Sequence, residues 1–178
     1  MRRKYGDEQL VDAVRNHLHG HLFHSTDAAN LGSISEHGLL SARAAEELGI
    51  APVYPGGNAL TQTMDAGAGL DNVVFLSFFN LGVMPKHEND RHRRRVLLKI
   101  DARILYSAGT QVALGRASRR STNVHRAAAA FYKMDWAAIA GQVDENDLRE
   151  RWRLFQVYDY EILVPNRVPP EFILGIVE

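Results

Sequence analysis

The amino-acid sequence predicts an α+β fold built on a mainly antiparallel sheet. The chain has 178 residues, of which 46% are hydrophobic and 24% charged, which suits one globular domain with a packed core. Apolar segments of strand length and amphipathic segments of helix length both occur. They alternate without the regular spacing of βαβ units, which favours antiparallel pairing. We therefore expect one domain over residues 1–178, with residues 1–20 as a helical N-terminal extension.

The N-terminal quarter predicts a helix, a short strand and a second helix. The first helix is expected over Asp7–His19, because apolar side chains recur along it at helical spacing. His21–His24 has the length of a strand. The second helix should begin at Thr26 or Asp27, whose side-chain oxygens suit an N-cap, and Gly38 suits its left-handed end.

The middle of the chain predicts a long loop between a short helix and a central strand. Ser41 can cap a helix that runs through Leu48, and residues 49–72 are then rich in Gly, Pro and Asn. A loop of this length in a compact domain is usually functional or mobile. The continuous apolar run at 73–79 predicts a central strand covered on both faces, and Arg95–Asp101 predicts another strand.

The C-terminal part predicts three helices and then two strands. The helices are expected over Asn123–Tyr132, Asp135–Ala140 and Glu145–Phe155. The strands are expected over Tyr158–Val164, which a proline follows, and over Phe172–Val177. This irregular order of helices and strands is the basis for predicting the α+β class.

The composition excludes several kinds of site. The chain has no cysteine, so disulfides and cysteine-based metal or nucleophile sites are excluded. Four histidines lie between His17 and His24, but Gly20 breaks the helix there and no carboxylate lies within the run, so we predict no metal. No stretch approaches the ~18 apolar residues of a membrane span, and the N-terminus lacks a secretion signal. We expect a cytoplasmic protein without a membrane partner.

Charge is unevenly distributed along this electrically neutral chain. Residues 27–90 carry eight acids and two bases, whereas residues 91–126 carry ten Lys or Arg and a single acid, Asp101. A concentrated basic segment suits a polyanionic partner, because each phosphate contact releases counterions. The segment therefore favours nucleic acid, and a merely solvated face is the alternative.

Several short motifs stand out when they are read together. They are His24-Ser25-Thr26 followed by Asn30-Leu31, then Gly38-Leu39-Leu40, Met134-Asp135-Trp136, and Glu161-Ile162-Leu163-Val164-Pro165 with Val168-Pro169. This set resembles the DarT family of ADP-ribosyltransferases, toxins that modify bases in nucleic acid. The resemblance spans about residues 21–177. It implies an ADP-ribosyltransferase-like fold, with a split, mainly antiparallel sheet and flanking helices.

The resemblance also implies an activity and its partners. NAD would be the ADP-ribose donor, without a metal, and the acceptor would be a nucleobase, with single-stranded DNA favoured. RNA or protein acceptors are an alternative, as is a catalytically weak module that only binds NAD or nucleic acid. A toxin of this kind implies a separate macrodomain antitoxin.

Glu161 is the predicted catalytic carboxylate. The bond between C1′ and nicotinamide breaks through an oxocarbenium-like state, which a rigidly held carboxylate stabilises. Glu161 lies near the start of a predicted strand and shares a strand face with Asp159 by alternation. The resemblance assigns it the catalytic role, including that of general base toward the acceptor. The alternative is an exposed acid on an edge strand.

The predicted NAD-binding residues come from two segments. His24, predicted to end a strand, would bond adenosine ribose hydroxyls, and Thr26 would assist at a helix start, where free N–H groups suit a diphosphate. A core histidine and a plain helix cap are the alternatives. The other candidates in these segments are Ser25, Asn30, Gly38, Leu39, Phe75, Ser77 and Phe78.

The sequence departs from the family pattern at one position. The resemblance implies a catalytic arginine in the loop before the central strand, but no arginine occurs between Arg43 and Arg91. Arg43 is therefore the candidate, although it lies early in the chain. A residue of the basic segment could take the role instead, or the role could be absent.

Candidate contacts to the nucleic acid lie in the basic segment and before Glu161. They are Arg93, Arg94, Arg119, Arg120, Arg149, Arg151, Trp152 and Arg153. An aromatic ring flanked by arginines can stack on an unpaired base and pair with its phosphates. The alternative for Trp152 is a helix that packs Leu148, Trp152 and Phe155 inward at i, i+4 and i+7.

Overall fold

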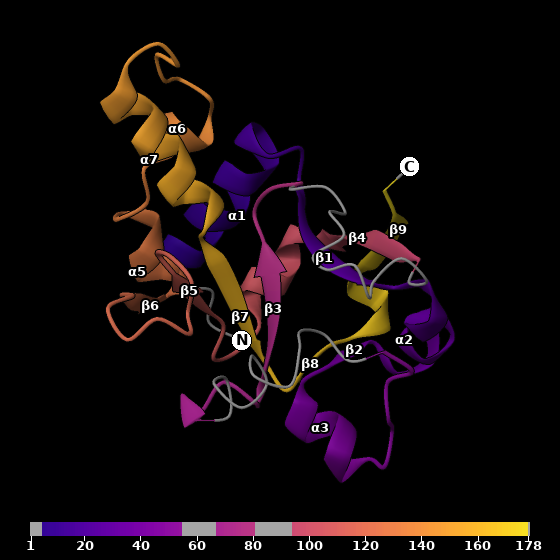
Figure 1. The fold of residues 1–178 in the computed structure, drawn as a ribbon. Coiled ribbons are helices and arrows are strands. Elements are labelled where there is room, and N and C mark those ends of the chain that lie inside the picture. The colour runs from indigo at the N-terminus through magenta and orange to yellow at the C-terminus, as the bar shows by residue number, and fades with distance from the viewer. Residues whose placement is uncertain (1–4, 55–66, 81–93, 178) are drawn as a thin grey trace.

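The structure is a computed structural model that describes residues 5–54, 67–80 and 94–177. Its main element is a seven-stranded sheet in the order β6-β5-β7-β3-β1-β4-β9, beside a two-stranded pair, β2-β8. All seven strand pairings are antiparallel, and helices flank the sheet (Figure 1). The predicted α+β class is therefore confirmed.

Short elements make up most of the fold. The strands are β1 (His21–Asp27), β2 (Leu39–Leu40), β3 (Val73–Ser77), β4 (Arg95–Asp101), β5 (Gln111–Ala113), β6 (Val124–Arg126), β7 (Glu161–Pro165), β8 (Arg167–Val168) and β9 (Ile173–Ile176). The α-helices are α1 (Tyr5–His17), α2 (Leu31–His37), α3 (Ala42–Glu47), α5 (Ala127–Phe131), α6 (Trp136–Ile139) and α7 (Leu148–Tyr158). The 3₁₀ turns are η1 (Ala28–Asn30), η3 (Ala102–Tyr106) and η4 (Pro170–Phe172).

The sheet consists of two halves with a narrow junction. Strand β1 pairs with β4 over all seven of its residues, and β3 pairs with β7 over five. Between β1 and β3, however, the register contains a single pair, Phe23 with Ser77. Beyond that pair β1 and β3 have no further register partners, and this is the split sheet that the family resemblance implies.

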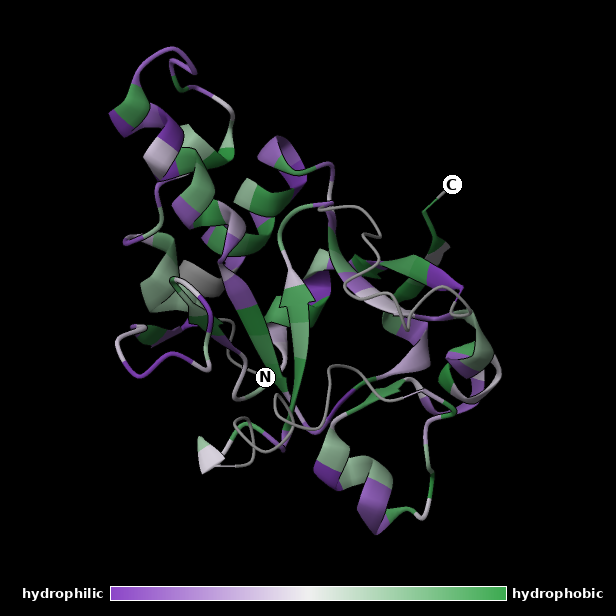
Figure 2. Ribbon diagram, in the orientation of Figure 1, coloured by the Kyte–Doolittle hydropathy of each residue, from purple (hydrophilic) through white to green (hydrophobic). Residues whose placement is uncertain are grey.

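Strand β3 buries one of its two faces. In β3 the side chains of Val74 and Leu76 are buried, and the pattern continues to Phe78, whereas Phe75 and Ser77 are half-buried. Figure 2 shows β3 and most of β7 as hydrophobic, with hydrophilic residues at the start of β7. The prediction of a strand fully covered on both faces is therefore too strong. One face of β3 is the core, and the other borders the candidate site.

Helix α1 is part of this core. Its Leu10, Val11 and Val14 are 0% exposed and belong to the same cluster as Leu22 and Ile100 from the sheet. The helix packs mainly against α5 and η3. The segment that the sequence predicts as an extension therefore contributes directly to the hydrophobic core.

Four of the predicted boundaries are wrong for tertiary reasons. Strand β1 continues to Asp27, because β4 offers pairing partners along its whole length. Residues 124–126 form strand β6 at the sheet edge, so the helix predicted from Asn123 begins only at Ala127. Helix α7 continues to Tyr158, which delays the start of the last long strand to Glu161.

Candidate active site

Glu161 is the first residue of β7, and the sheet register places it in a row of neighbours. It lies opposite Ser77 on β3 and opposite Ala113 on β5, while Ser77 lies opposite Phe23 on β1. Directly opposed residues of antiparallel strands share a face of the sheet. The half-buried Glu161 side chain therefore projects from the same face as Ser77, on the border of the buried core.

A loop between β5 and β6 holds the Glu161 side chain. The backbone N–H of Ala117 donates to Glu161 Oε2 at 2.7 Å. The same loop contacts Asp159, because Arg116 Nε donates to Asp159 Oδ1 at 2.9 Å and Arg119 Nη1 lies 3.5 Å from Asp159 Oδ2. Sequence reasoning missed Ala117 and Arg116 as site neighbours, because a backbone donor has no side-chain signature and only the fold brings this loop to Glu161. It expected Asp159 beside Glu161 by strand alternation, but Asp159 is the C-cap of α7 and lies before the strand.

His24 lies at the split between the two half-sheets. Its Nδ1 donates to the backbone carbonyl of Phe75 at 2.8 Å, a carbonyl that β1 does not pair. Because a carbonyl only accepts, the neutral ring carries its proton on Nδ1 and has Nε2 as an acceptor. Burial lowers the pKa of His24, and the bond to Phe75 opposes this only in part. The contact agrees with the alternative of a core histidine that bonds the backbone. It also makes Nε2 able to accept a hydrogen bond from a hydroxyl.

The residues after His24 continue as a strand and then form a turn. Ser25 is exposed and Thr26 is half-buried, both within β1, so of the two predicted caps, Thr26 and Asp27, Thr26 does not begin the turn. Asp27 is the cap, since its Oδ1 accepts from Ala29 N at 2.9 Å. It follows that Thr26 offers its hydroxyl from a strand end.

Asn30 is committed to the backbone of the long loop. Its Nδ2 donates to the carbonyl of Tyr54 at 2.8 Å, and its Oδ1 accepts from Tyr54 N at 3.2 Å. The Asn30 side chain is 8% exposed. This paired amide ties Tyr54 to the turn that follows β1, so both polar groups of Asn30 have protein partners.

Three candidates for the nicotinamide wall lie on or just after β3. Phe75 and Ser77 are half-buried on the face that carries Glu161. Ser77 Oγ also bonds the backbone of Phe79, which turns the chain at the strand end. Phe78 is 0% exposed within the core cluster, so its predicted contact with NAD is not supported. A buried ring stabilises the wall from behind.

Gly38 and Leu39 have packing roles in the structure. Gly38 has φ +79°, and a Cβ there would lie 2.1 Å from the carbonyl oxygen of Val168, so only glycine fits. Leu39 is 4% exposed and pairs with Val168 in the small β2-β8 ladder. Both residues therefore join the first candidate motif to the last one through backbone contacts.

Arg43 does not approach Glu161. Its guanidinium makes bonds of 2.8–3.2 Å to the carboxylate of Asp71, and its N–H donates to the carbonyl of Asp71. Asp71 precedes Ser77 by six residues, or roughly 20 Å of extended chain. In Figure 1, α3 lies near the start of β3, whereas α7 and the start of β7 lie near the other end of that strand. The structure therefore gives Arg43 a role in fixing the loop before β3, and its predicted catalytic role is not supported.

The basic segment is divided in space. Arg94, an exposed residue, lies beside β4, whereas Arg119 and Arg120 lie in the loop after β5. Strands β4 and β5 have three strands between them, a separation of about 19 Å at normal strand spacing. The segment is therefore two basic surfaces, of which only the β5–β6 part adjoins Glu161. Arg93 lies outside the described residues.

Arg153 is fully engaged within the protein. Its Nε and Nη2 donate to the two oxygens of Asp135 at 2.7 and 2.8 Å, and its Nη1 donates to Glu150 at 2.6 Å. These bonds raise the pKa of Arg153 and lower that of Asp135. The predicted contact of Arg153 with nucleic acid is not supported, because its donors anchor α7 to α6.

The opposite side of α7 is an exposed apolar stripe. Leu148, Trp152 and Phe155 are 73%, 63% and 59% exposed, so the alternative in which they pack inward is wrong. Arg149 and Arg151 are exposed on the same helix, and neither has an ion pair within the described part of the chain. Helix α7 leads directly into Glu161 (Figure 1). We call these five residues the α7 face.

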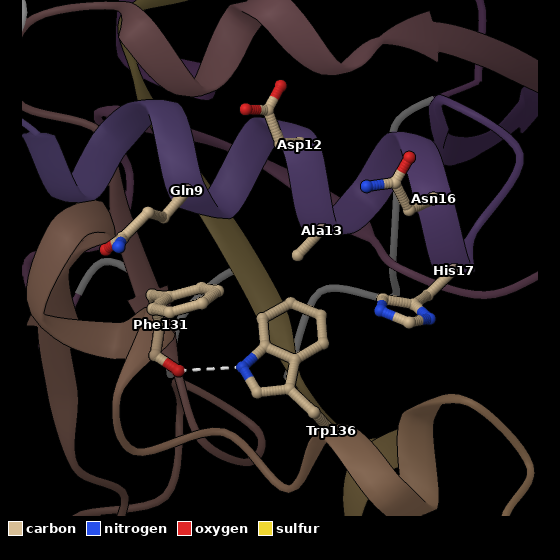
Figure 3. Close-up of a pocket in the computed structure, with 7 residues that line it drawn as sticks. All are labelled: Gln9, Asp12, Ala13, Asn16, His17, Phe131 and Trp136. Carbon is tan, nitrogen blue, oxygen red and sulfur yellow. Dashed lines mark hydrogen bonds between the residues drawn. The ribbon is translucent and has the colours of Figure 1, made fainter.

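A separate pocket of about 280 Å³ lies between α1 and the α5–α6 region. Figure 3 shows Trp136 beside Phe131, with Trp136 Nε1 donating to the Phe131 carbonyl at 2.8 Å. None of the lining residues is a predicted NAD contact, so this pocket is distinct from the candidate site. Over the described ranges, no cluster of three or more His, Asp or Glu could hold a metal, and no helix could cross a membrane.

Comparison with protein families gives one match. Residues 23–178 match the family model described as ssDNA thymidine ADP-ribosyltransferase, DarT. The matched span contains both His24 and Glu161. No curated protein matches the sequence.

Solved structures show the same fold. Thermosipho africanus DarTG in complex with ADP-ribose superposes with a TM-score of 0.59 at 18% identity, covering 86% of this chain and 42% of that chain. Thermus sp. 2.9 DarT in complex with ADP-ribosylated ssDNA gives 0.61 at 16% identity, covering 86% and 78%. The same Thermus protein in complex with NAD+ gives 0.56 at 15% identity, covering 86% and 79%. The chain thus spans less than half of the Thermosipho chain.

Proposed function

This chain belongs to the DarT family of ssDNA thymidine ADP-ribosyltransferases, and from that premise we propose that it transfers ADP-ribose from NAD to thymidine in single-stranded DNA. The observation that carries the proposal is the position of Glu161 at the head of β7, in one row with Ser77 and close to the sheet split at His24. Glu161 on β7 and His24 on β1 lie two strand spacings apart in the sheet, which is about 10 Å. A dinucleotide readily spans such a distance.

NAD would be held at the split of the sheet. His24 contributes an acceptor at Nε2 for a ribose hydroxyl, because its Nδ1 is committed to Phe75. Ser25 and Thr26 continue along the same strand end, and their hydroxyls suit the sugar and diphosphate. Phe75 and Ser77 provide the wall on the β3 side, where the half-buried ring suits stacking on nicotinamide.

Glu161 would stabilise the charge that develops on the donor sugar. The bond between C1′ and the nicotinamide nitrogen breaks, and nicotinamide leaves with the bonding electron pair. The carboxylate faces the resulting oxocarbenium-like ribose. A ring nitrogen of thymine then bonds to C1′ as it loses its proton to Glu161, a general-base contribution of about 10²–10⁴-fold. The products are nicotinamide, the ADP-ribosylated base and a proton.

The direct test is Glu161→Gln, which keeps the size of the side chain and removes its charge. Short single-stranded oligonucleotides with and without thymidine are incubated with NAD and analysed by mass spectrometry. We expect ADP-ribose on thymidine-containing DNA with the wild type and at least 10²-fold less with the variant. Glu171→Gln, which changes an exposed acid on η4, is the matched control. A fully active Glu161→Gln protein would contradict the proposal.

The same reaction separates the other acceptors. RNA oligonucleotides and cell lysate are run in parallel with the DNA. Stronger labelling of RNA or protein would replace the proposed acceptor while keeping the transferase chemistry. If NAD binds but neither NAD consumption nor any product appears, the protein is instead a binding module of the same fold.

The α7 face is our candidate surface for the DNA strand. It combines the exposed rings of Trp152 and Phe155 with the cationic side chains of Arg149 and Arg151, on the helix that leads into Glu161. Rings stack on unpaired bases of any sequence, and arginines pair with the phosphates between them. Arg119 and Arg120 extend this basic surface beside Glu161, Arg119 while paired with Asp159, whereas Arg94 lies on the separate basic surface beside β4.

We further propose that the chain acts as a toxin in the cytoplasm, where NAD and DNA are both present, and that a macrodomain protein opposes it. Modified thymidine would block copying of the strand, because the added group occupies the pairing edge of the base. Expression in growing cells should arrest growth in the wild type and not in Glu161→Gln. Co-expression of an ADP-ribosyl-hydrolysing macrodomain should restore growth, and arrest by the Gln variant would refute the toxin role.

A further inference from the structure

The β5–β6 loop, residues 114–123, connects two strands next to Glu161. Its first strand ends at Ala113, which lies opposite Glu161 on one side and opposite Val124 on the other. The register therefore places the start of the loop beside the proposed catalytic carboxylate and its end one strand further away, on β6. Strand β5 has only three residues, so the position of the loop depends on further contacts.

Two kinds of contact hold this loop against the start of β7. The Ala117 N–H donates to Glu161 Oε2 at 2.7 Å. One residue earlier, Arg116 Nε donates to Asp159 Oδ1 at 2.9 Å, and Arg119 adds a weaker contact of 3.5 Å to the other oxygen. Asp159 caps the C-terminus of α7, two residues before Glu161. The ion pair and the N–H bond thus act on the same short segment.

The loop is folded on itself, which gives these contacts a defined geometry. Thr122 Oγ1 donates to the carbonyl of Arg116 at 2.7 Å, and Arg119 N donates to that carbonyl at 3.0 Å. Gly115 has φ +144°, and a Cβ there would lie 3.3 Å from Thr122 Oγ1. The carbonyl of residue 116 and the N–H of residue 117 belong to one peptide plane. Fixing the carbonyl therefore also fixes the direction of the Ala117 N–H.

We propose that Arg116 and Asp159 are positioning residues for the transferase reaction, because their ion pair holds the Ala117 N–H on Glu161 and so fixes the orientation of the catalytic carboxylate. This inference rests on the proposed role of Glu161. A carboxylate aimed at a developing positive charge contributes most when it does not need to reorient. We call the Arg116–Asp159 ion pair, together with the Ala117 N–H bond to Glu161, the clamp. The family pattern implies an arginine in the loop before β3, which this sequence lacks, and the clamp orders the site from the side of β5 instead.

A competing explanation is that Arg116 and Arg119 simply bind DNA phosphates. The two explanations predict that Asp159→Asn changes different quantities, the affinity for DNA in one case and the turnover rate in the other. If the arginines bind DNA, Asp159→Asn frees them and should improve DNA affinity. If they position Glu161, the same change loosens the loop and lowers the turnover rate at saturating DNA.

The kinetic test uses the full-length protein with NAD and a thymidine-containing oligonucleotide. We expect Arg116→Gln and Asp159→Asn each to lower kcat by about 10–100-fold, since small misplacements of catalytic groups cost this much, with little change in the KM for DNA. The double variant should be no slower than either single one, because both changes break the same ion pair. Arg103→Gln is the control, since Arg103 is about as exposed as Arg116 and pairs with Asp101 where β4 meets η3.

A measurement independent of activity keeps the inference distinct from the proposed function. Amide hydrogen exchange at Ala117 should be slow in the wild type and faster in Arg116→Gln, Asp159→Asn and Glu161→Ala, but unchanged in Arg103→Gln. Slow exchange in every variant, or a raised KM for DNA with unchanged kcat, would overturn the clamp while leaving the transferase assignment intact. A wild type that never modifies DNA would instead overturn the assignment, and the exchange data would still decide whether the clamp exists.

Discussion

At the scale of single residues, the proposed site depends on side chains that use one polar atom to bond the protein and offer another polar atom to the substrate. His24 illustrates this, because its bond to the Phe75 carbonyl determines the tautomer and makes Nε2 the acceptor. The contact was invisible in the sequence, since the two residues are 51 positions apart. A histidine in this role must be neutral, and burial favours that form by lowering its pKa below 6.5.

The lowered pKa predicts how NAD binding depends on pH. Protonation removes the acceptor at Nε2, and it occurs only as pH falls through a pKa below 6.5. The Kd for NAD, measured by calorimetry, should therefore stay constant from pH 8 to 6.5 and rise at lower pH. His24→Ala should weaken binding about tenfold at pH 7.5, the value of one hydrogen bond, and remove this dependence. His37→Gln, on α2, serves as the control, and a Kd that rises between pH 8 and 7 would contradict the assignment.

At the scale of elements, helix α7 has two sides with different roles. Arg153 anchors one side to Asp135 and Glu150. The other side exposes Trp152 and Phe155 together with Arg149 and Arg151, which form no ion pair with any residue that the structure describes. Spacing at i, i+4 and i+7 predicts an apolar stripe in either case, but it does not say whether another element covers the stripe. In the structure Arg153 joins α7 to the N-cap of α6, whereas the apolar stripe is exposed.

The exposed stripe predicts a specific effect on DNA binding. Loss of one stacked ring costs about 1–3 kcal/mol per base, so Trp152→Ala should weaken binding of a single-stranded oligonucleotide by about 5- to 150-fold. Fluorescence anisotropy measures the affinity, and NAD affinity should be unchanged. Leu174→Ala on β9 removes a side chain of similar exposure at the far edge of the sheet and is the control. Equal affinities for the two variants would argue against the α7 face.

At the scale of the whole molecule, we propose one domain in which α1 is integral. The matched family residues begin at 23, so α1 precedes them. Nevertheless Leu10, Val11 and Val14 are fully buried in the hydrophobic core. The sequence predicts residues 1–20 as an extension, because the family motifs lie after them. The hydrophobic core nevertheless includes α1.

Packing of α1 predicts a large stability effect far from the site. Leu10→Ala should lower the free energy of unfolding by about 2–5 kcal/mol, because a fully buried side chain is replaced by a cavity. Asp12→Ala, on the exposed side of the same helix, should change it by less than about 0.5 kcal/mol. Urea denaturation followed by circular dichroism measures both. Equal, small effects would mean that α1 is a dispensable appendage.

The sequence alone determined the elements whose signals are local. Caps and end residues such as Asp27, Ser41 and Gly38 located helix boundaries, and apolar runs located β3 and β4. The motifs around His24 and Glu161 also identified the family, which the family match then confirmed. These signals need only neighbours within a few residues, so they can be read without knowing the fold.

The tertiary structure alone decided which of these residues meet. Arg43 and Arg153 are taken up by carboxylates that sequence spacing does not connect to them, Phe78 is enclosed by the core, and the basic segment is divided between two half-sheets. The N–H of Ala117 reaches Glu161 across 44 positions. Such contacts follow from strand order and register, which are set by the packing of the entire core rather than by any short segment of chain.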